Sequence, residues 1–448
     1  MFGYNKMSYQ PYYPIDRAAE GLRPYICRLA PQGGELEVEW FDKGAPDAAH
    51  TLYYAERGGE DWKTVPLFDR CVKLTGFPED HREYQLYIAR EDGTRSNLRL
   101  WRTGAVAGRV INYLHPEDPQ YAFVGQFLAS PSIVCLDNGA LLASMDVFHK
   151  DGPRNLSLLF RSDDDGVNWH YVTDLFPCFW GTLFTHRGVL YLLNVSNKYG
   201  NIQIACSTDG GINWSAPSVL MHGSCVPNRK GFHRAPMPVI SYKGRLWVSM
   251  DFGGWESHAF DAILMSIDQN ADPMVAENWV FTQPTPHDKR WKNAGERAYG
   301  GIEGNAVVAP DGRVATMLRY NESPTALMFK NDMTDPHAPL TFWQVAPFPM
   351  GHTKFEVRRH SDGTYYAAGN TYPARNCLSL YRSSDLENWE LVEHIVNRRD
   401  ASEKEVGYQY PAFIFNGEQE ILLLSRTADN YADTFHNSNY VTFHRIPL

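Results

Sequence analysis

The sequence has little of what marks nucleic-acid-binding or membrane proteins. It carries 42 Lys and Arg residues against 52 Asp and Glu residues, a formal net charge of −10, and no basic block stands out. Nucleic acid and anionic membrane surfaces are therefore not expected as partners. No stretch approaches the roughly 18 uninterrupted apolar residues of a membrane-spanning helix, so we expect no membrane segment.

Cysteine motifs are also lacking. The seven cysteines are scattered and form no CxxC pair, which predicts free thiols rather than a redox motif. Neither an HExxH motif, an EF-hand loop nor a paired Cys/His cluster occurs, so no metal site and no cofactor are predicted. The first residues lack the apolar run of a signal peptide. We therefore expect a cytoplasmic protein, or a secreted or periplasmic one if a leader was removed.

Aromatic residues, glycine and proline are abundant. The 448 residues include 13% aromatics, 35 Gly and 28 Pro, and 43% of the chain is hydrophobic. This composition favours many short strands joined by tight turns, and it leaves enough apolar material for a sizeable core. We predict an all-β fold and exclude a coiled coil.

An N-terminal β-sandwich is predicted for residues 20–105. Short runs such as Leu36–Trp40 and Tyr84–Ile88 alternate apolar and polar residues between turns, as in a sandwich. The segment Leu74-Thr-Gly-Phe-Pro78, followed by Tyr84, resembles the fibronectin type III pattern. The resemblance implies a module that spaces, docks or shields a neighbouring domain, and direct sugar binding is the alternative.

One hairpin signal recurs six times after residue 120. Each copy has an apolar strand, a polar turn with glycine and a second apolar strand, and successive glycines lie 49 to 68 residues apart. A period near 50 with four strands per unit is typical of a propeller blade. We predict a six-bladed β-propeller over residues 115–448, with hairpin turns at Gly139, Gly188, Gly244, Gly312, Gly363 and Gly417.

A second motif follows the hairpin in several units. The segments Ser162–Trp169 and Ser207–Trp214 both read S-x-D-x-G-x-x-W, and Ser383–Trp389 is a shortened copy without the glycine. Ser and Asp side chains can bond the backbone of the turn, and the Trp can pack beneath it. The motif therefore indicates structure rather than chemistry.

Polar residues gather at one predicted mouth of the propeller. The first strand of each blade begins, and the second ends, on the same face, and nearly every blade carries a polar or charged residue there. Such groups must satisfy one another or face water or a ligand, and a ligand pocket is the prediction. Strand alternation does not settle whether Arg234 faces this pocket, nor which of Tyr408 and Tyr410 does. The candidates are Asp146, Trp180, Asn194, His233, Arg234, Asp251, Glu303, Arg319, His352, Lys354, Tyr408, Tyr410 and Arg426.

Over residues 120–448 the chain resembles the sialidase superfamily. The S-x-D-x-G-x-x-W turns are similar to Asp-boxes of BNR-repeat propellers, and Glu303–Gly312 followed by Arg319 is similar to the segment with the sialidase glutamate and second arginine. Leu141–Asp146 is similar to the segment that delivers the acidic aspartate, and Gly407–Tyr410 lies in the blade that supplies the tyrosine. The resemblance implies a glutamate paired with a tyrosine nucleophile, an aspartic acid group and three arginines that clamp a carboxylate.

The chain departs from the sialidase pattern at the first blade. It reads Ala129-Ser130-Pro131 where sialidases carry Arg-Ile-Pro, and an Arg-x-Pro occurs only two blades later, at Arg234. A third cation could come from Arg426 or Arg375. Because a bidentate arginine is the natural clamp for a carboxylate, this departure bears on the choice of substrate.

Three functions fit these residues. The first is an exo-acting, sialidase-like glycoside hydrolase on an acidic or highly hydroxylated sugar, using Glu303 with Asp146 or Asp251. Tyr408 or Tyr410 would serve as nucleophile, and the remaining candidates would bind substrate. The second is a polysaccharide lyase that acts next to a uronic acid with His, Tyr and Arg groups. The third is a non-catalytic glycan-binding propeller. All three imply a carbohydrate partner, and none predicts the oligomeric state.

Overall fold

The computed structural model describes residues 10–11, 22–224, 230–255, 259–291, 300–320 and 324–448. Cys225 lies outside these ranges, and no disulfide joins the six cysteines within them. Almost all regular structure in these ranges is strand, which confirms the predicted all-β class. The described helices are three single 3-10 turns, and none is long and apolar enough to cross a membrane. They are η1 (Pro119–Tyr121), η2 (Ala276–Asn278) and η3 (Lys289–Trp291).

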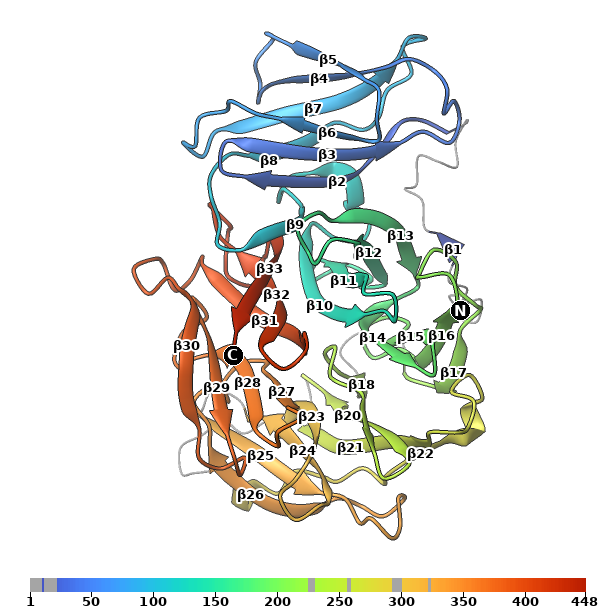
Figure 1. The fold of residues 1–448 in the computed structure, drawn as a ribbon, viewed down its shortest axis with the longest axis vertical. Coiled ribbons are helices and arrows are strands. Elements are labelled where there is room, and N and C mark those ends of the chain that lie inside the picture. The colour runs from blue at the N-terminus through green and yellow to red at the C-terminus, as the bar shows by residue number, and fades with distance from the viewer. Residues whose placement is uncertain (1–9, 12–21, 225–229, 256–258, 292–299, 321–323) are drawn as a thin grey trace.

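Two small antiparallel sheets form the N-terminal part of the chain, drawn in blue at the top of Figure 1. The first contains β2 (Tyr25–Gln32), β3 (Glu35–Phe41) and β6 (Cys71–Leu74). The second contains β5 (Lys63–Leu67), β4 (His50–Glu56), β7 (Glu83–Arg90) and β8 (Arg99–Arg102). Residues from both sheets share one apolar core. The alternation read from the sequence is the reason, because it turns one face of each strand inward.

Six antiparallel sheets of four or five strands follow in chain order, coloured from green to red in Figure 1. The first sheet contains β10 (Phe127–Cys135), β11 (Leu141–Phe148), β12 (Leu156–Ser162), β13 (His170–Phe176) and β1 (Gln10–Pro11). The second contains β14 (Phe179–His186), β15 (Val189–Val195), β16 (Ile202–Ser207) and β17 (Ser218–Met221). The third contains β18 (Gly231–His233), β19 (Ile240–Tyr242), β20 (Arg245–Gly254), β21 (Ala259–Asp268) and β22 (Trp279–Phe281). The fourth sheet contains β23 (Ile302–Val308), β24 (Val314–Arg319), β25 (Thr325–Lys330) and β26 (Thr341–Pro347). The fifth contains β27 (Glu356–Arg359), β28 (Tyr365–Asn370), β29 (Cys377–Ser383) and β30 (Glu390–Asn397). The sixth contains β31 (Gly407–Phe415), β32 (Glu420–Ala428), β33 (Tyr440–Pro447) and β9 (Arg109–Tyr113).

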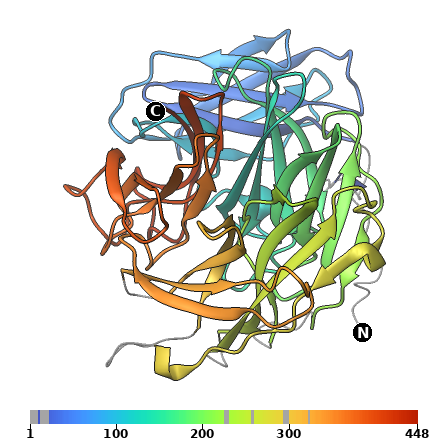
Figure 2. The same cartoon turned by 60° about the horizontal axis from the view of Figure 1, so that its bottom comes forward.

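The six sheets close into a ring. Apolar clusters bridge neighbouring sheets, and one of them joins β10 and β11 of the first sheet to β32 and β33 of the last. In the turned view of Figure 2 the red strands of the last sheet lie beside the green and teal strands of the first. Strand β9 pairs with β33, so the last sheet takes its outer strand from a segment that precedes residue 115.

The predicted hairpins are present in all six sheets. Their turn glycines all have positive φ, between 64° and 96°. The three S-x-D segments also share one set of bonds, in which the serine hydroxyl donates to the aspartate and the aspartate accepts an asparagine N–H. In the third segment Leu386 takes the place of the glycine at φ 68°, and its side chain is buried.

The N-terminal sheets rest directly on the ring. Arg28 donates to the carbonyl of Ile111 at 2.6 Å, and Arg99 donates to Asp118 at 2.6 Å. The N-terminal core continues into the last ring sheet through Tyr113 and Tyr440. The two parts of the chain therefore share buried ionic and apolar contacts.

Candidate active site

A repeated backbone irregularity places the central side chains. Ser130, Trp180, Glu303 and Tyr410 lie on the innermost strands of four sheets, and all have φ between 47° and 55°. Each coincides with a register shift against the second strand, which marks a β-bulge. A bulge interrupts the alternation of side chains along a strand and redirects one of them. Four sheets thus use the same device at the same place.

Glu303, Tyr410 and Arg319 form the most tightly connected group. The Tyr410 hydroxyl donates to Glu303 Oε1 at 2.9 Å, and Arg319 Nη1 lies 3.0 Å from Glu303 Oε2. The same Arg319 nitrogen lies 3.4 Å from the Tyr410 oxygen. Glu303 is only 4% exposed, whereas Tyr410 is partly exposed. The structure therefore brings a base, a hydroxyl group and a cation from three different strands into contact.

The charges around this group fix its protonation. Burial opposes ionisation of Glu303, but the charges of Arg319 and His233 and the hydrogen bonds from Arg319 and Tyr410 lower the pKa of the carboxyl. Burial and the nearby Glu303 carboxylate raise the pKa of Tyr410. At neutral pH the pair is an ionised acceptor and a protonated phenol, which is the arrangement needed for base-assisted attack by the hydroxyl.

Two further arginines face Tyr410. The guanidinium carbons of Arg426 and Arg375 lie 5.2 Å and 6.0 Å from the centre of its ring. Burial and the positive neighbours of each lower the pKa of both arginines to about 10, so they remain protonated at neutral pH. Among the described residues no carboxylate forms a salt bridge with either arginine; Arg375 donates to the Gln409 side chain and Arg426 to the His436 carbonyl. Buried positive charge of this kind favours an anionic ligand.

Asp251 and His233 lie behind the glutamate. Asp251 Oδ2 accepts the backbone N–H of Glu303 at 2.8 Å and lies 3.2 Å from His233 Nδ1. Burial raises the pKa of the Asp251 carboxyl. Because Asp251 bonds the bulged residue itself, it holds the Glu303 backbone in its left-handed conformation.

Asp146 occupies the equivalent place in the first sheet. Its carboxyl accepts the Ser157 hydroxyl at 2.6 Å and the backbone N–H of Trp180 at 2.9 Å. Burial raises the pKa of Asp146 to about 7, although these hydrogen bonds oppose the shift. Two residues further along β11, Phe148 packs under the Arg426 guanidinium, whose carbon lies 4.8 Å from the ring centre. Asp146 is therefore a carboxyl group that can hold a proton near neutral pH, next to the arginines.

Trp180 and His352 complete the set of predicted residues near the site. The rings of Trp180 and His233 meet edge to face with their centres 4.8 Å apart. The carbonyl of His352 accepts Arg319 Nε at 3.0 Å. Burial and the charges of Arg375 and Arg319 lower the pKa of His352 to about 3, so its ring is neutral.

Four predicted residues are engaged elsewhere. Tyr408 lies in an apolar core and donates to Asp429 at 2.6 Å. Arg234 donates to the Leu193 carbonyl and to Thr182 between the second and third sheets. Asn194 accepts from Gln203, and the ammonium of Lys354 contacts Glu356 and the Pro411 carbonyl. The site also contains Arg375 and Ser157, which the sequence does not place among the pocket candidates. Arg375 had a sequence signal only as a spare cation, and Ser157 had none.

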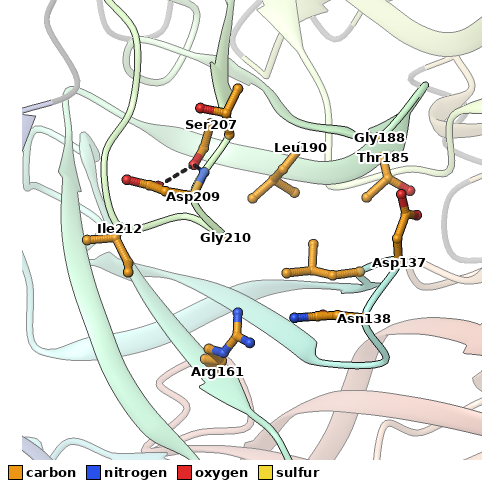
Figure 3. Close-up of a pocket in the computed structure, with 12 residues that line it drawn as sticks. Asp137, Asn138, Arg161, Thr185, Gly188, Leu190, Ser207, Asp209, Gly210 and Ile212 are labelled. Carbon is orange, nitrogen blue, oxygen red and sulfur yellow. Dashed lines mark hydrogen bonds between the residues drawn. The ribbon is translucent and has the colours of Figure 1, made fainter.

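A separate cleft lies between the first two ring sheets. Figure 3 shows it beside the second S-x-D turn, with Asp209 hydrogen-bonded to Ser207. Arg161 on its wall is bound to Asp163 at 2.6 Å. Its charged groups are thus largely used within turns, and it is lined by none of the residues around Glu303.

Comparisons with known proteins show which solved structures have a similar fold. No family model matches the sequence, and no curated protein matches it. Solved structures do match. A Hadza microbial sialidase superposes with a TM-score of 0.53 at 12% identity, covering 98% of each chain. The leech intramolecular trans-sialidase, complexed with 2,7-anhydro-Neu5Ac, has a TM-score of 0.51 at 12% identity, covering 98% of this chain and 93% of the other.

The chain shares its overall fold with these two solved structures. A third match shows that the likeness extends beyond sialidases. An alpha-L-arabinanase of Penicillium chrysogenum, complexed with arabinobiose, has a TM-score of 0.51 at 13% identity over 76% of this chain and 98% of its own. At such low identities the comparisons establish architecture, and the chemistry must be argued from the residues.

Proposed function

We propose that this chain is a glycoside hydrolase that acts on a sugar carrying a carboxylate. The observation that carries the proposal is the Tyr410 hydroxyl, hydrogen-bonded at 2.9 Å to the buried, ionised Glu303. A tyrosine bonded to an ionised base is an activated nucleophile. The placement of Tyr408 in an apolar core supports the assignment of the nucleophile to Tyr410.

The first step forms a covalent intermediate. The Tyr410 oxygen attacks the anomeric carbon while its proton passes to Glu303, and the bond from that carbon to the leaving-group oxygen breaks. The leaving oxygen takes a proton from Asp146, whose raised pKa of about 7 suits a general acid. Water then attacks the intermediate and gives its proton to Asp146, and Glu303 returns the proton to the Tyr410 oxygen. Two displacements retain the anomeric configuration.

The arginines select the substrate charge. Arg319, Arg375 and Arg426 surround Tyr410, and the last two lie over its ring. A carboxylate near the anomeric carbon would accept hydrogen bonds from such a cluster. A neutral phenol also avoids the repulsion that a carboxylate nucleophile would meet from an anionic substrate. Arg426 would replace the arginine that sialidases carry on the first sheet, where this chain has Ser130.

We also propose the finer architecture. The closed ring of six sheets supports a six-bladed β-propeller, with domains at about residues 20–105 and 115–448 as predicted from the sequence and with β9 joined to the second. The two-sheet N-terminal part supports a fibronectin type III-like sandwich. The shared hydrogen bonds of the S-x-D turns support their assignment as Asp-boxes.

A panel of glycosides with and without a carboxylate tests this function. The full chain should release sugar from an acidic glycoside, and Glu303→Gln should lower kcat/KM by on the order of 10³-fold or more. Glu393→Gln, on an exposed part of β30, is the matched control and should keep full activity. Retained turnover in Glu303→Gln would contradict the proposal. An unsaturated product would establish a lyase, and binding without turnover would establish a glycan-binding module.

A further inference from the structure

A mixed cluster of ligand atoms lies where the N-terminal sheets meet the ring. Glu39 on β3 and Cys71 on β6 are direct cross-strand partners, so their side chains stand together on one face. His170, the first residue of β13 in the ring, reaches this pair from the other side. One oxygen, one sulfur and one nitrogen from three strands thus converge, and all lie within 4.8 Å of one another.

The spacing matches that of ligands around a tetrahedral metal ion. His170 Nδ1 lies 3.6 Å from Cys71 Sγ and 3.8 Å from Glu39 Oε2. With metal bonds of about 2.3 Å to sulfur and about 2.0 Å to nitrogen, tetrahedral angles place sulfur and nitrogen about 3.6 Å apart. The oxygen needs to move a few tenths of an ångström closer to the nitrogen. Its distance to the sulfur is at most 4.8 Å, and a bound ion would draw these two atoms together to about 3.6 Å.

We propose that Glu39, Cys71 and His170 form a binding site for Zn²⁺. Thiolate, imidazole and carboxylate together are donors that Zn²⁺ accepts, whereas Ca²⁺ and Mg²⁺ prefer oxygen alone. The fourth position would be taken by water, since the His170 side chain is 53% exposed and gives an ion access. The site lies apart from Glu303 and Tyr410 and does not depend on the proposed hydrolase chemistry.

The ring orients one of the three ligands, Glu39. Glu39 Oε2 accepts the backbone N–H of Tyr171 at 2.9 Å, so the carboxylate is oriented by the ring strand that carries His170. A cavity of 280 Å³ adjoins the cluster, lined by Glu39 and Tyr171 among others. An ion here would bond β3 and β6 to β13 and would tie the N-terminal sheets to the ring. The ion would stabilise the fold, because an ion that binds only the folded chain adds its binding free energy to the free energy of unfolding.

Metal titration of the full chain tests the site. Co²⁺ serves as the probe because a cobalt–thiolate bond gives a strong near-ultraviolet charge-transfer band, and calorimetry with Zn²⁺ gives the stoichiometry. We expect one Zn²⁺ per chain, a thiolate band with Co²⁺, and a higher Tm with Zn²⁺. Cys71→Ser should abolish the band and weaken Zn²⁺ binding by at least ~10-fold. Cys135→Ser, which removes the other exposed thiol in the described part of the chain, should change neither.

The opposite results are equally distinct. Absence of a thiolate band in the unaltered chain, or a band that persists in Cys71→Ser, would overturn the proposal. His170→Asn gives a second test, because it removes the nitrogen ligand while leaving the Cys71 thiol in place. Zn²⁺ binding of unchanged affinity in His170→Asn would also overturn it. Sugar hydrolysis by each variant reports on the ring site separately, so failure of one proposal does not affect the other.

Discussion

At the residue scale, Tyr408 and Tyr410 show how one strand can serve two purposes. Residues two apart on a regular strand face the same way, but the bulge at Tyr410 interrupts this rule. Tyr410 consequently meets Glu303, and Tyr408 points into the core and bonds Asp429. Removal of the Tyr410 hydroxyl should therefore affect catalysis, whereas removal of the Tyr408 hydroxyl should affect stability.

Tyr410→Phe should lower kcat by on the order of 10³-fold or more and leave the Tm almost unchanged, because only the reacting oxygen is lost. Tyr408→Phe should keep kcat and lower the free energy of unfolding by about 1–3 kcal/mol, because buried Asp429 loses a hydrogen-bond donor. Steady-state kinetics and thermal unfolding of both variants check the pair. A catalytic defect in Tyr408→Phe alone would reverse the assignment.

Asp146 predicts the pH profile. Burial raises the pKa of its carboxyl to about 7, and the acid acts only while protonated. The kcat/KM value should therefore hold below about pH 7 and fall as pH rises through it. In Asp146→Asn this alkaline limb should disappear, and the loss of activity should be smaller for substrates with a good leaving group. An unaltered alkaline limb in Asp146→Asn would show that another group supplies the proton.

At the element scale, the bulges of the innermost strands orient the side chains of the site. Asp251 accepts the N–H of Glu303, as Asp146 accepts the N–H of Trp180 in the first pair of sheets. The segments Ser144–Asp146 and Ser249–Asp251 are sequence repeats, and the structure gives both the same backbone contact. Asp251 is thus a positioning residue for Glu303.

Asp251→Ala should lower kcat by about 10- to 100-fold with little change in KM, because Glu303 loses the contact that fixes its backbone. Asp251→Asn keeps an oxygen acceptor and should restore part of the loss. Kinetics over a substrate range separates kcat from KM. A purely structural role would lower the Tm of both variants without this recovery of kcat in Asp251→Asn.

The elements were predictable to different degrees. Hairpin glycines and S-x-D turns are local signals, and the sequence located both because the left-handed conformation favours glycine and because short polar side chains bond the turn. The bulges were not predictable, since Glu303 and Tyr410 adopt positive φ only under tertiary contacts such as the Asp251 bond. Strand alternation alone therefore left the choice between Tyr408 and Tyr410 open.

The long-range clusters show the same limit. Arg319 was placed by its spacing from Glu303, which lies on the neighbouring strand of one hairpin. Glu39, Cys71 and His170 come from three strands far apart in the chain, and no motif spacing can find such a set. Arg234 and Asn194 looked like pocket residues because register along a strand cannot show what the neighbouring sheet offers as a partner.

At the scale of the whole molecule, the contact between the N-terminal sheets and the ring contains buried ionisable groups. Asp174 on β13 is fully buried and accepts the Tyr171 hydroxyl at 2.8 Å, while its second oxygen has no partner among the described residues. Burial raises the pKa of Asp174 to about 8. The folded protein therefore holds this carboxyl in its neutral form at neutral pH.

This burial predicts a loss of stability as pH rises. The unfolded carboxyl has a pKa of about 4, so between about pH 4 and 8 the native state binds more protons than the unfolded state. The contribution of Asp174 to stability is thus complete below pH 4 and falls until about pH 8. Asp174→Asn should flatten the pH dependence of the Tm and be relatively more stable at pH 9. An equal slope in both proteins would contradict the burial argument.

The central claim is that Tyr410 is the nucleophile of a retaining glycosidase for acidic sugars. It is tested most directly by incubating the chain with an activated fluorosugar that carries a carboxylate, followed by peptide mapping with mass spectrometry. We predict one covalent glycosyl adduct on Tyr410, formed in the unaltered chain and lacking in Tyr410→Phe. An adduct on Glu303 or Asp146, or turnover of the acidic glycoside by Tyr410→Phe at the unaltered rate, would contradict it.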